Sequence, residues 1–423
     1  MRAELRCAMN AASARALISR WPDAWLLDGV RTPFVDYVQS LALVSPIDLG
    51  IKVARETFAR SGIPATDTGT VIAGSVAQAS FDAYLVPRHI GLYAGVPTEV
   101  PAHLVQRVCG TGFEAIGQAA DALTLGRADL ALCVGAESMS RNPVAAYTHR
   151  SGFRMGQVEF KDFLWEALLD PAVNDTMGGT AERLARQYGI TRADADGFAA
   201  RSFARAVEAQ ASEFLAGEIC ALQDEMFSIG DFKPRGIKLR GKEKTVSADT
   251  HIRPSPIEVL AGIKPAFGGV QTGGNSSALV DGAAAVLVGS SQYAKRRGRK
   301  PLARLVAAAT AGVPPEIMGI GPVVAIRALL DAAQLKLADI DRVEINEAFA
   351  AQVLACVREL GLDESRLNVN GGAIAIGHPL AATGIRITLT LARELQRKGL
   401  RYGIGSACVG GGQGIAILIE NAA

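Results

Sequence analysis

Short apolar runs separated by amphipathic stretches dominate the chain. The runs at 70–76, 130–137, 283–290 and 403–410 are bounded by glycine or charge and have the length of buried strands. An earlier run at Ala24–Leu27 predicts the first strand. After "CGTG", apolar residues recur at the spacing of one helix face, at Phe113, Ile116, Ala120 and Leu123. Such alternation predicts an α/β fold with helices on both faces of a sheet.

A weak internal repeat divides the chain. "ALCVGAES" (131–138) and "GSACVGGG" (405–412) each end a strand-like run with Cys-Val-Gly, and each follows a helix that opens at a Gly/Thr-rich turn. A duplicated βαβ-type unit explains both matches, with two related halves facing one another. Two short matches also arise by chance, so the repeat alone leaves the duplication open.

The segment 140–264 has a different character. Its charges cluster, as in "DFKPRGIKLRGKEKT" (231–245), and strand signals become sparse. Two helices are still legible, at 180–189 and 193–217. We therefore predict an inserted domain laid over the core and not a flexible linker.

Composition indicates an ordinary soluble globular protein. Hydrophobic residues make up 49% of the 423 residues, charged residues 20%, and the formal net charge is +2. A net charge this small does not indicate the basic surface of a nucleic-acid-binding protein. No run approaches the roughly 18 consecutive apolar residues of a membrane-spanning helix. The six cysteines form no CxxC pair, and there are only five histidines, which argues against a disulfide scaffold and a zinc site. We expect an intracellular, reduced enzyme without a bound metal.

The first 20 residues hold four arginines and one acidic residue among many alanines and serines. This composition suits an organellar presequence, a disordered bacterial extension or a wrongly chosen start codon. We assign 1–23 as an N-terminal extension. We expect the protein in the bacterial cytoplasm, with the mitochondrion as the alternative because of the arginines.

"RVCGTGFEA" (107–115) holds the strongest chemical signal of the first half. Cys109 ends an extended segment and precedes a helix. A thiol at a helix N-terminus feels the positive end of the helix dipole, so we expect its pKa to fall by one or more units from about 8.5. A buried, inert cysteine is the alternative interpretation.

Three later residues complete a candidate constellation. His378 lies in a glycine-rich turn before a proline, where an imidazole could act as base for a nucleophilic thiol. Asn346 ends an apolar run, and its amide could donate to a developing oxyanion. Cys408 ends a strand-like run just before a glycine cluster. Each residue alone has a structural interpretation, but their combination favours catalysis.

Ordered stretches from about Ala24 to Glu420 resemble the thiolase family. They are "DGVRTPF" (28–34), "CGTG" (109–112), "GAESMS" (135–140), "MGGTAERLA" (177–185), "KPAF" (264–267), "GGNSSALVDGAAAVL" (273–287), "PEIMGIGPVVAIR" (315–327), "EINEAFAAQ" (344–352), "GGAIAIGHP" (371–379) and "ACVGGGQG" (407–414). The resemblance implies a five-layered αβαβα core of two duplicated halves. The implied boundaries are 24–139 with 265–296 for the first half, 140–264 for an inserted loop domain and 297–423 for the second half.

The resemblance also implies catalytic roles. Cys109 matches the nucleophile that takes up the acyl group as a thioester, His378 matches its base, and Cys408 matches the cysteine that moves a proton on the substrate or the incoming thiol. Asn346 matches the residue that holds a water in one oxyanion hole. The backbone N–H groups of Cys109 and Gly410 match the other hole. A second thiol suits this reaction because the expelled carbanion must be protonated close to the nucleophile.

Coenzyme A is implied as a co-substrate, with no permanently bound cofactor. The positions that match the family's CoA and substrate pocket are Met177, Arg253, Phe267, Ser277, Met318 and Phe349. The apolar members of this set, Phe267, Met318 and Phe349, could equally be plain core. The family further implies a homodimer or homotetramer that binds acyl-CoA, and an α-subunit of β-oxidation as a candidate partner.

Departures from the commonest family pattern bear on the substrate. Gln106, Thr176 and the turn "HPLAATG" (378–384) resemble degradative enzymes more than acetoacetyl-CoA enzymes. We therefore predict a thiolase of fatty-acid β-oxidation that cleaves 3-ketoacyl-CoA to acetyl-CoA and a shortened acyl-CoA through an acyl-Cys109 intermediate. The alternatives are a short-chain, biosynthetic acetoacetyl-CoA thiolase and a non-catalytic thiolase-like lipid-binding protein. A β-ketoacyl synthase of the same fold is disfavoured by Cys408.

Overall fold

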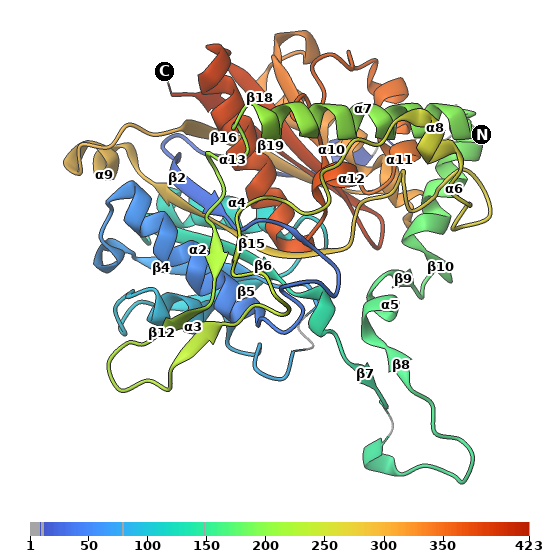
Figure 1. Ribbon diagram of the computed structural model, residues 1–423. Helices are drawn as coiled ribbons and strands as arrows, with labels where there is room; N and C mark the ends of the chain where they lie inside the picture. Colours follow the sequence, from blue (N-terminus) through green and yellow to red (C-terminus); the bar gives the residue numbers. More distant parts are fainter. Residues whose placement is uncertain (1–8, 10–11, 78–79, 148, 423) are drawn as a thin grey trace.

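An eleven-stranded sheet forms the centre of the computed structural model, which describes residues 9, 12–77, 80–147 and 149–422 (Figure 1). Its strands are β1 (Leu17–Arg20), β2 (Trp25–Arg31), β3 (Val35–Asp36), β4 (Thr70–Gly74), β5 (Ala102–Val105), β6 (Leu130–Glu137), β15 (Val280–Gly289), β16 (Ala303–Gly312), β17 (Arg342–Ile345), β18 (Tyr402–Val409) and β19 (Gln413–Asn421). The continuous order is β17-β18-β19-β16-β2-β15-β6-β4-β5, with β1 added to β16 and β3 to β15. The pairing of β2 with β16 joins its two related halves, which are called the first and the second sheet below.

The two halves of the chain repeat one strand arrangement. In the first half β4 lies parallel to β6, and β6-β15-β2 continue antiparallel. In the second half β17 lies parallel to β18, and β18-β19-β16 continue antiparallel in the same way. The outermost strand β5 of the first half corresponds to a single parallel bridge between Val343 and Leu367 in the second half. The duplication expected from the Cys-Val-Gly repeat is therefore present in the topology.

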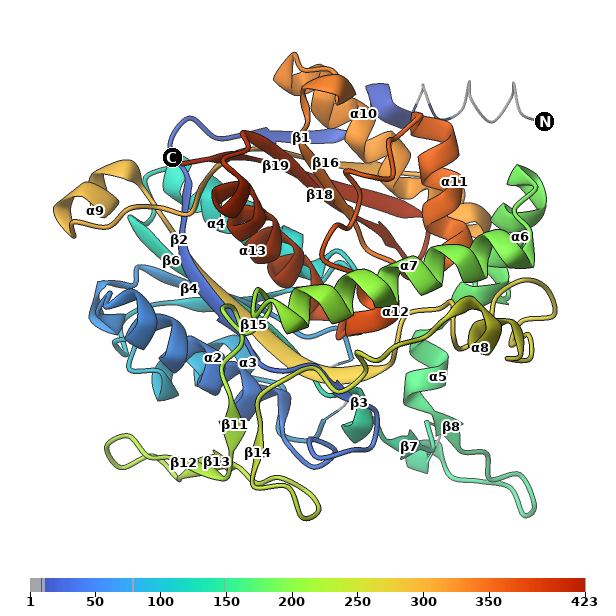
Figure 2. The ribbon, with the colours of Figure 1, turned by 45° about the horizontal axis from the view of Figure 1, so that its top comes forward.

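Helices complete five layers, which can be followed from top to bottom in Figure 2. The helices of the two halves are α2 (Pro46–Ser61), α3 (Val86–Tyr93), α4 (Thr111–Thr124), α9 (Ser291–Arg296), α10 (Gly321–Ala333), α11 (Ala350–Leu360), α12 (Ala373–Ile376) and α13 (Leu380–Lys398). Helices α2 and α3 cover the outer face of the first sheet, and α10 covers the outer face of the second. Helices α4 and α13 pack against each other between the sheets. The predicted αβαβα architecture is confirmed.

Glycines allow the two central helices to touch through their backbones. A Cβ atom on Gly112 of α4 would lie 2.6 Å from the backbone nitrogen of Ile385 in α13, which is too close for any side chain. Gly384 of α13 meets the backbone of Phe113 in the same manner. This contact brings the first turns of both helices together, and with them the segments that precede each helix.

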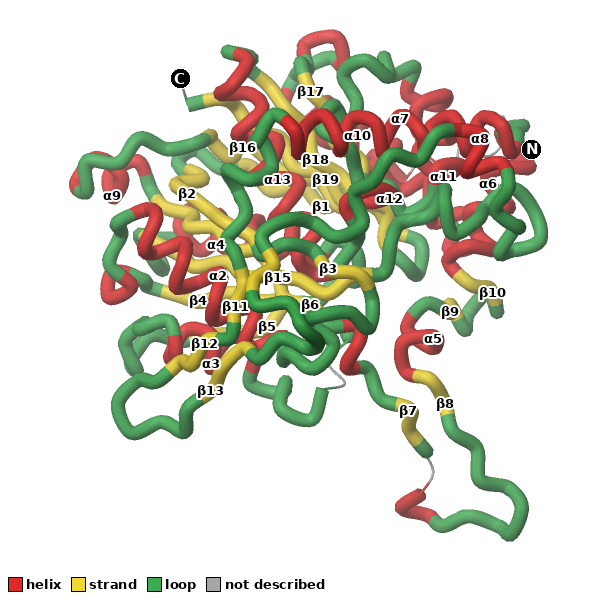
Figure 3. Tube along the Cα trace, viewed as in Figure 1, coloured by secondary structure: helices red, strands yellow, loops and turns green. Residues whose placement is uncertain are grey.

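The segment that connects β6 to β15 lies over both halves. It contains β7 (Val144–Ala145), β8 (Lys161–Asp162), α5 (Phe163–Ala167), β9 (Leu169–Asp170), β10 (Asp175–Thr176), α6 (Met177–Tyr188), α7 (Arg192–Ala211), β11 (Leu222–Gln223), β12 (Glu225–Phe227), β13 (Arg235–Ile237), β14 (Thr245–Val246) and α8 (Ile257–Ala261). Helices α6 and α7 pack on α11, whereas β13 packs on α2. The β7–β8 arm projects from the body, and loops make up much of the segment (Figures 1 and 3).

The strands and helices expected from the apolar pattern are present. The four predicted runs correspond to β4, β6, β15 and β18, and the helices expected at 180–189 and 193–217 correspond to α6 and α7. The assignment of 1–23 as an extension that precedes the first strand needs a correction. Residues Leu17–Arg20 form strand β1, so the first strand precedes Ala24 and this part of the extension is neither disordered nor separate from the fold. Its four residues, LISR, are too few and too polar to be recognised as a strand from the sequence. Residues 1–8 lie outside the described part.

Candidate active site

Four loops meet where the first turns of α4 and α13 touch. Cys109 precedes α4, His378 precedes α13, Asn346 follows β17, and Cys408 lies at the end of β18. Cys109 shares a small apolar cluster with Leu380, two residues after His378. The backbone of Asn346 donates to Ser406 of β18 at 2.8 Å. The structure thus brings together all four side chains that the sequence singled out, from opposite halves of the duplication.

A tight, strained turn presents Cys109. Val108 before it has a φ of 43°, in the left-handed region that β-branched residues avoid. The hydroxyl of Thr111 donates to the Val108 carbonyl at 2.7 Å and accepts from the backbone N–H of Arg107 at 2.9 Å. Arg107 in turn bonds Gln413 of β19 at 2.8 Å. These contacts fix the thiol against the end of the second half's sheet.

The predicted lowering of the Cys109 pKa is wrong. Burial raises the pKa of this thiol to about 11, against the opposing effect of the backbone N–H groups of Gly410 and Cys109, which point at the sulfur. Helix α4 begins only at Thr111, so its dipole does not outweigh the loss of water around the sulfur. Cys109 is therefore a neutral thiol at rest and needs a base to become a nucleophile.

The side chain of His378 is a neutral imidazole at pH 7. Burial, with the positive charge of Arg386, lowers its pKa to about 3. Its Nδ1 lies 2.6 Å from the hydroxyl of Thr383, and its Nε2 lies 3.3 Å from the side-chain nitrogen of Asn346. With the proton on Nδ1, the ring donates to Thr383 and keeps a lone pair on Nε2. That tautomer can accept a proton at the edge facing the site.

Asn346 carries an unused hydrogen-bonding group. The residue is buried, and within the described part of the chain its Oδ1 has no hydrogen-bond partner. Buried amide oxygens are normally satisfied, so an unpartnered one at a functional site indicates a place for a water or a substrate group. Oδ1 can only accept, so it fits the water that the family resemblance implies, whereas the donor nitrogen that the sequence analysis aimed at an oxyanion faces Nε2 of His378.

Cys408 is a second thiol directly beside the first. Its side chain is 0% exposed, and its strand residue pairs with Gly414 of β19. Burial raises its pKa well above the ordinary value, and the neighbouring thiols Cys109 and Cys356 add to the rise. Gly410 follows two residues later, where a Cβ would lie 3.3 Å from the sulfur of Met177, and its backbone N–H bonds the Cys109 sulfur.

A cavity of about 360 Å³ opens beside these residues. It is lined by Tyr37, Asp162, Leu164, Trp165, Leu168, Thr176, Met177, Gly178, Phe267, Ser276, Ser277, Leu279 and Phe349. Leu164 also belongs to the cluster around Cys109, and Phe349 to the cluster around Cys408. The cavity therefore lies next to the residues that pack on the two thiols, although neither thiol is part of its lining, and its mostly apolar wall suits an elongated, largely apolar ligand.

The predicted CoA-binding residues divide into two groups. Met177, Phe267, Ser277 and Phe349 line the cavity. Met318 is buried behind it, in the cluster with Phe349 and Cys408. Arg253 is exposed outside the cavity lining, with its guanidinium 5.6 Å from the ring centre of Phe203.

Sequence reasoning missed several supporting residues. Glu137 at the end of β6 accepts from the backbone of Val76 at 2.9 Å, Ala77 at 3.0 Å and Ala381 at 3.3 Å, which ties the first half to the first turn of α13. A lone acidic residue ending an otherwise apolar strand was the available signal. Thr383 lies within the quoted histidine turn, but only the fold shows its hydroxyl beneath the ring.

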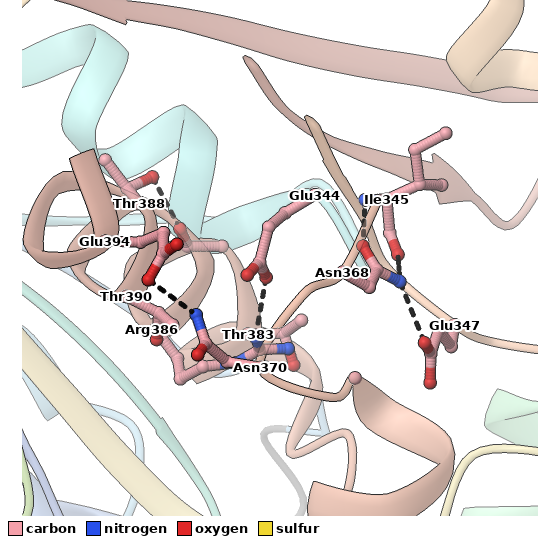
Figure 4. Close-up of polar contacts among 12 residues, drawn as sticks. Glu344, Ile345, Glu347, Asn368, Asn370, Thr383, Arg386, Thr388, Thr390 and Glu394 are labelled. Atoms are coloured by element: carbon pink, nitrogen blue, oxygen red, sulfur yellow. Dashed lines mark hydrogen bonds and ion pairs between the residues drawn. The ribbon is translucent and has the colours of Figure 1, made fainter. Parts of the chain in front are cut away.

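Buried polar contacts hold the loops of Asn346 and His378 (Figure 4). Arg386 of α13 bonds Glu344 of β17 at 3.0 Å, and burial raises the pKa of Glu344 to about 8. Asn368 donates to the carbonyl of Ile345 at 2.9 Å and to Glu347 at 2.8 Å. These bonds link the strand before Asn346 to the helix after His378.

Among the described residues, no group of His, Cys, Asp and Glu side chains has the arrangement needed to hold a metal ion. No helix in the same part of the chain is long and apolar enough to cross a membrane.

Comparison with known proteins identifies the class. The thiolase N-terminal domain model matches residues 25–292, and the thiolase C-terminal domain model matches residues 299–421. The chain belongs to the thiolase family and is an acyltransferase.

Individual relatives are similar along nearly their whole length. The mitochondrial 3-ketoacyl-CoA thiolase of Bos taurus is 40% identical over 397 residues, covering 93% of this chain and 97% of the relative. The 3-ketoacyl-CoA thiolase of Bacillus subtilis is 39% identical over 403 residues, covering 94% and 99%. The crystal structure of the human mitochondrial 3-ketoacyl-CoA thiolase superposes with a TM-score of 0.89 at 39% identity, covering 95% of this chain and 99% of that one. A similar structure of the human protein contains CoA.

Proposed function

We propose that this thiolase cleaves 3-ketoacyl-CoA with coenzyme A, through an acyl thioester on Cys109. One observation supports this most strongly: two interacting thiols and a neutral imidazole beside an unsatisfied buried amide lie next to the wall of one apolar cavity. The bovine and Bacillus subtilis relatives are both named as 3-ketoacyl-CoA thiolases, which agrees with this reaction. Neither name favours a β-ketoacyl synthase.

The first half-reaction begins with the Cys109 thiol. Nε2 of His378 takes its proton, and the sulfur attacks the C3 keto carbon of the substrate. The oxyanion that forms there faces the backbone N–H groups of Cys109 and Gly410, which already point at the sulfur. The C2–C3 bond then breaks, leaving the acyl group on Cys109 and an acetyl-CoA enolate.

The enolate is the group that requires the second cysteine. Its thioester oxygen is stabilised by the side of the site that holds Asn346 and His378, and its carbon takes the proton of Cys408. Because Cys408 is a buried thiol, it is protonated and ready to donate. Acetyl-CoA then leaves.

The second half-reaction restores the resting site. Cys408, now a thiolate, takes the proton of an incoming CoA thiol, and the CoA sulfur attacks the Cys109 thioester. The shortened acyl-CoA forms, and Cys109 leaves as a thiolate that recovers its proton from His378. Every proton returns to its starting group.

The cavity supplies the binding site for CoA in this proposal. Met177, Phe267, Ser277 and Phe349 form its wall, and Met318 supports Phe349 from behind. Arg253 lies outside the lining, where we place the adenine end of the ligand.

A shorter substrate is the second candidate. The acetyl-CoA acetyltransferase of Bacillus anthracis also superposes with a TM-score of 0.89, at 40% identity. The residue Thr176, which departs from the acetoacetyl-CoA pattern, lines the cavity and favours the longer substrate.

The test is a thiolysis assay over a series of 3-ketoacyl-CoA chain lengths, with Cys109→Ala as the blank. Activity that peaks at medium or long chains supports the degradative function, and activity confined to acetoacetyl-CoA supports the second candidate. No activity above the blank, with ligand binding retained, would identify a lipid-binding protein.

Assembly, domain boundaries and location are also proposals. We propose the domain division 24–139 with 265–296 for the first half, 140–264 for the inserted domain and 297–423 for the second half.

We further propose that the protein is a homodimer or homotetramer. No strand in the described part of the chain pairs with the outer edge of β5, and the β7–β8 arm exposes Met155 and Phe160. An α-subunit would be a further partner. Relatives occur in bacteria and in mitochondria, so we propose the bacterial cytoplasm as the location of this protein and the mitochondrion as the alternative. Mass measurement of the purified protein tests the assembly.

A further inference from the structure

The N-terminal extension lies outside both family matches, the first of which begins at residue 25. Its described part is nevertheless well integrated. Strand β1 pairs antiparallel with β16, from Leu17 opposite Thr310 to Arg20 opposite Ala307. The next residue continues the contact, since the Trp21 backbone donates to Val306 at 3.0 Å.

This pairing covers an edge of the second half's sheet. One side of β16 pairs with β19, while β2 reaches the other side only at Ala303 and Arg304. Without β1, the backbone groups of 306–310 on that side would be left unpaired. Bare strand edges of this kind are sites of fraying and of aggregation.

The same residues also bind the first half. The indole N–H of Trp21 donates to Asp121 of α4 at 2.6 Å, and the hydroxyl of Ser19 donates to the other oxygen of Asp121 at 3.4 Å. The Trp21 ring is 2% exposed and lies over Gly117, where a Cβ would be 3.7 Å from the ring. Helix α4 is the helix that Cys109 precedes.

We propose that residues 17–21 are a strap that fastens helix α4 of the first half to strand β16 of the second. Its backbone is held by one half and its side chains by the other. The strap therefore opposes any opening between the two halves at the helix that presents Cys109. This role is independent of the reaction assigned to the site.

Substitution of Trp21 tests the proposal in the full-length protein. Trp21→Phe removes the N–H that reaches Asp121 but keeps a ring over Gly117. The matched control is Trp25→Phe, because the indole of Trp25 also donates to a carboxylate at 2.6 Å, but to Asp23, only two residues away. Hydrogen exchange, followed by mass spectrometry, measures local opening without reference to activity.

The expected result for Trp21→Phe is an exchange rate at least tenfold faster in peptides covering 306–310 and 116–121, with no such change in Trp25→Phe. Asp121→Asn should show the same pattern as Trp21→Phe, because it weakens the same bond. Exchange at both segments equal to that of the unsubstituted protein would overturn the proposal. Faster exchange throughout the molecule in both tryptophan variants would also overturn it, since that result means general destabilisation.

A truncation that begins at Trp21 is the second test. Loss of β1 leaves the edge of β16 bare, so we expect a lower melting temperature and concentration-dependent aggregation. The control Leu17→Ser changes a side chain of β1 that is 69% exposed, and should change neither property. A truncated protein that melts and sediments like the full chain would contradict a strap. Thiolysis activity plays no part in either readout, so the strap and the proposed function can fail separately.

Discussion

Thr383 orients the ring of the proposed base, because its hydroxyl is the partner of Nδ1 of His378 at 2.6 Å. Thr383→Val keeps the shape of the side chain and removes that partner. We expect kcat for thiolysis to fall about tenfold, a fraction of what general-base catalysis contributes, with KM within twofold. Thr383→Ser should retain most of the rate. A valine variant with unchanged kcat would show that the hydroxyl does not position the ring.

The raised pKa of Cys109 predicts the pH dependence of its alkylation. With a pKa of about 11, the thiolate fraction at pH 7 is on the order of 10⁻⁴ and rises with pH. Inactivation of the free enzyme by iodoacetamide should therefore accelerate about tenfold per pH unit between pH 7 and 9. A thiol whose pKa is lowered to about 7.5 would accelerate only about fourfold over that whole range, and one with a still lower pKa would react at a nearly constant rate. Cys109→Ala provides the baseline for reaction at other cysteines.

At the residue scale, sequence reasoning singled out the proposed catalytic groups but not their environment. Cys109, His378, Asn346 and Cys408 were identified from their motifs and lie together. The direction of the Cys109 pKa was wrong because burial depends on segments far along the chain that no local motif reveals. Leu164 and Trp165 line the cavity but lie in a short helix whose sequence carries no distinguishing pattern.

Helix packing at the centre of the molecule depends on glycine. Gly112→Ala would place a Cβ 2.6 Å from the backbone of α13, and we expect a loss of about 1–3 kcal/mol in the free energy of unfolding, together with reduced thiolysis. The matched control is Gly197→Ala in α7, where nothing lies within 4 Å of the new Cβ. That change should be neutral or stabilise by up to about 1 kcal/mol. Denaturant unfolding measures both, and equal stabilities would contradict the close contact of α4 with α13.

At the element scale, long apolar strands and long helices were predictable, and short edge elements were not. β6 and β15 are buried along their whole length, so they read as continuous apolar runs. β1 and the two-residue strands of the inserted segment have no such signature. They are defined by partners distant in the sequence, as β1 is by β16.

A buried charge cluster joins the parts of the whole molecule. Arg31 of the first half bonds Glu218 at 2.7 Å and Asp249 at 2.6 and 2.8 Å, both in the inserted segment. Thr390 of α13 donates to the same Glu218 at 2.9 Å. The cluster therefore connects both halves and the inserted segment through one carboxylate.

Removal of the arginine tests this connection. Arg31→Met leaves two buried carboxylates without their counter-charge, and such a loss typically costs about 3–5 kcal/mol. Arg401→Met breaks an exposed pair with Glu420 and an exposed contact with the Tyr402 ring, and should cause only a small loss. Denaturant unfolding at pH 7 distinguishes the two variants. Equal stability of both would mean that the cluster does not hold the parts together.

Identification of the acylated residue is the most direct test of the proposed mechanism. The enzyme is incubated with a 3-ketoacyl-CoA without free CoA, quenched in acid and mapped by peptide mass spectrometry. The proposed mechanism predicts an acyl group on Cys109, its absence in Cys109→Ala, and its removal when CoA is added to the unsubstituted enzyme. An acyl group carried by Cys408 or another residue, or turnover of the substrate by Cys109→Ala, would contradict it.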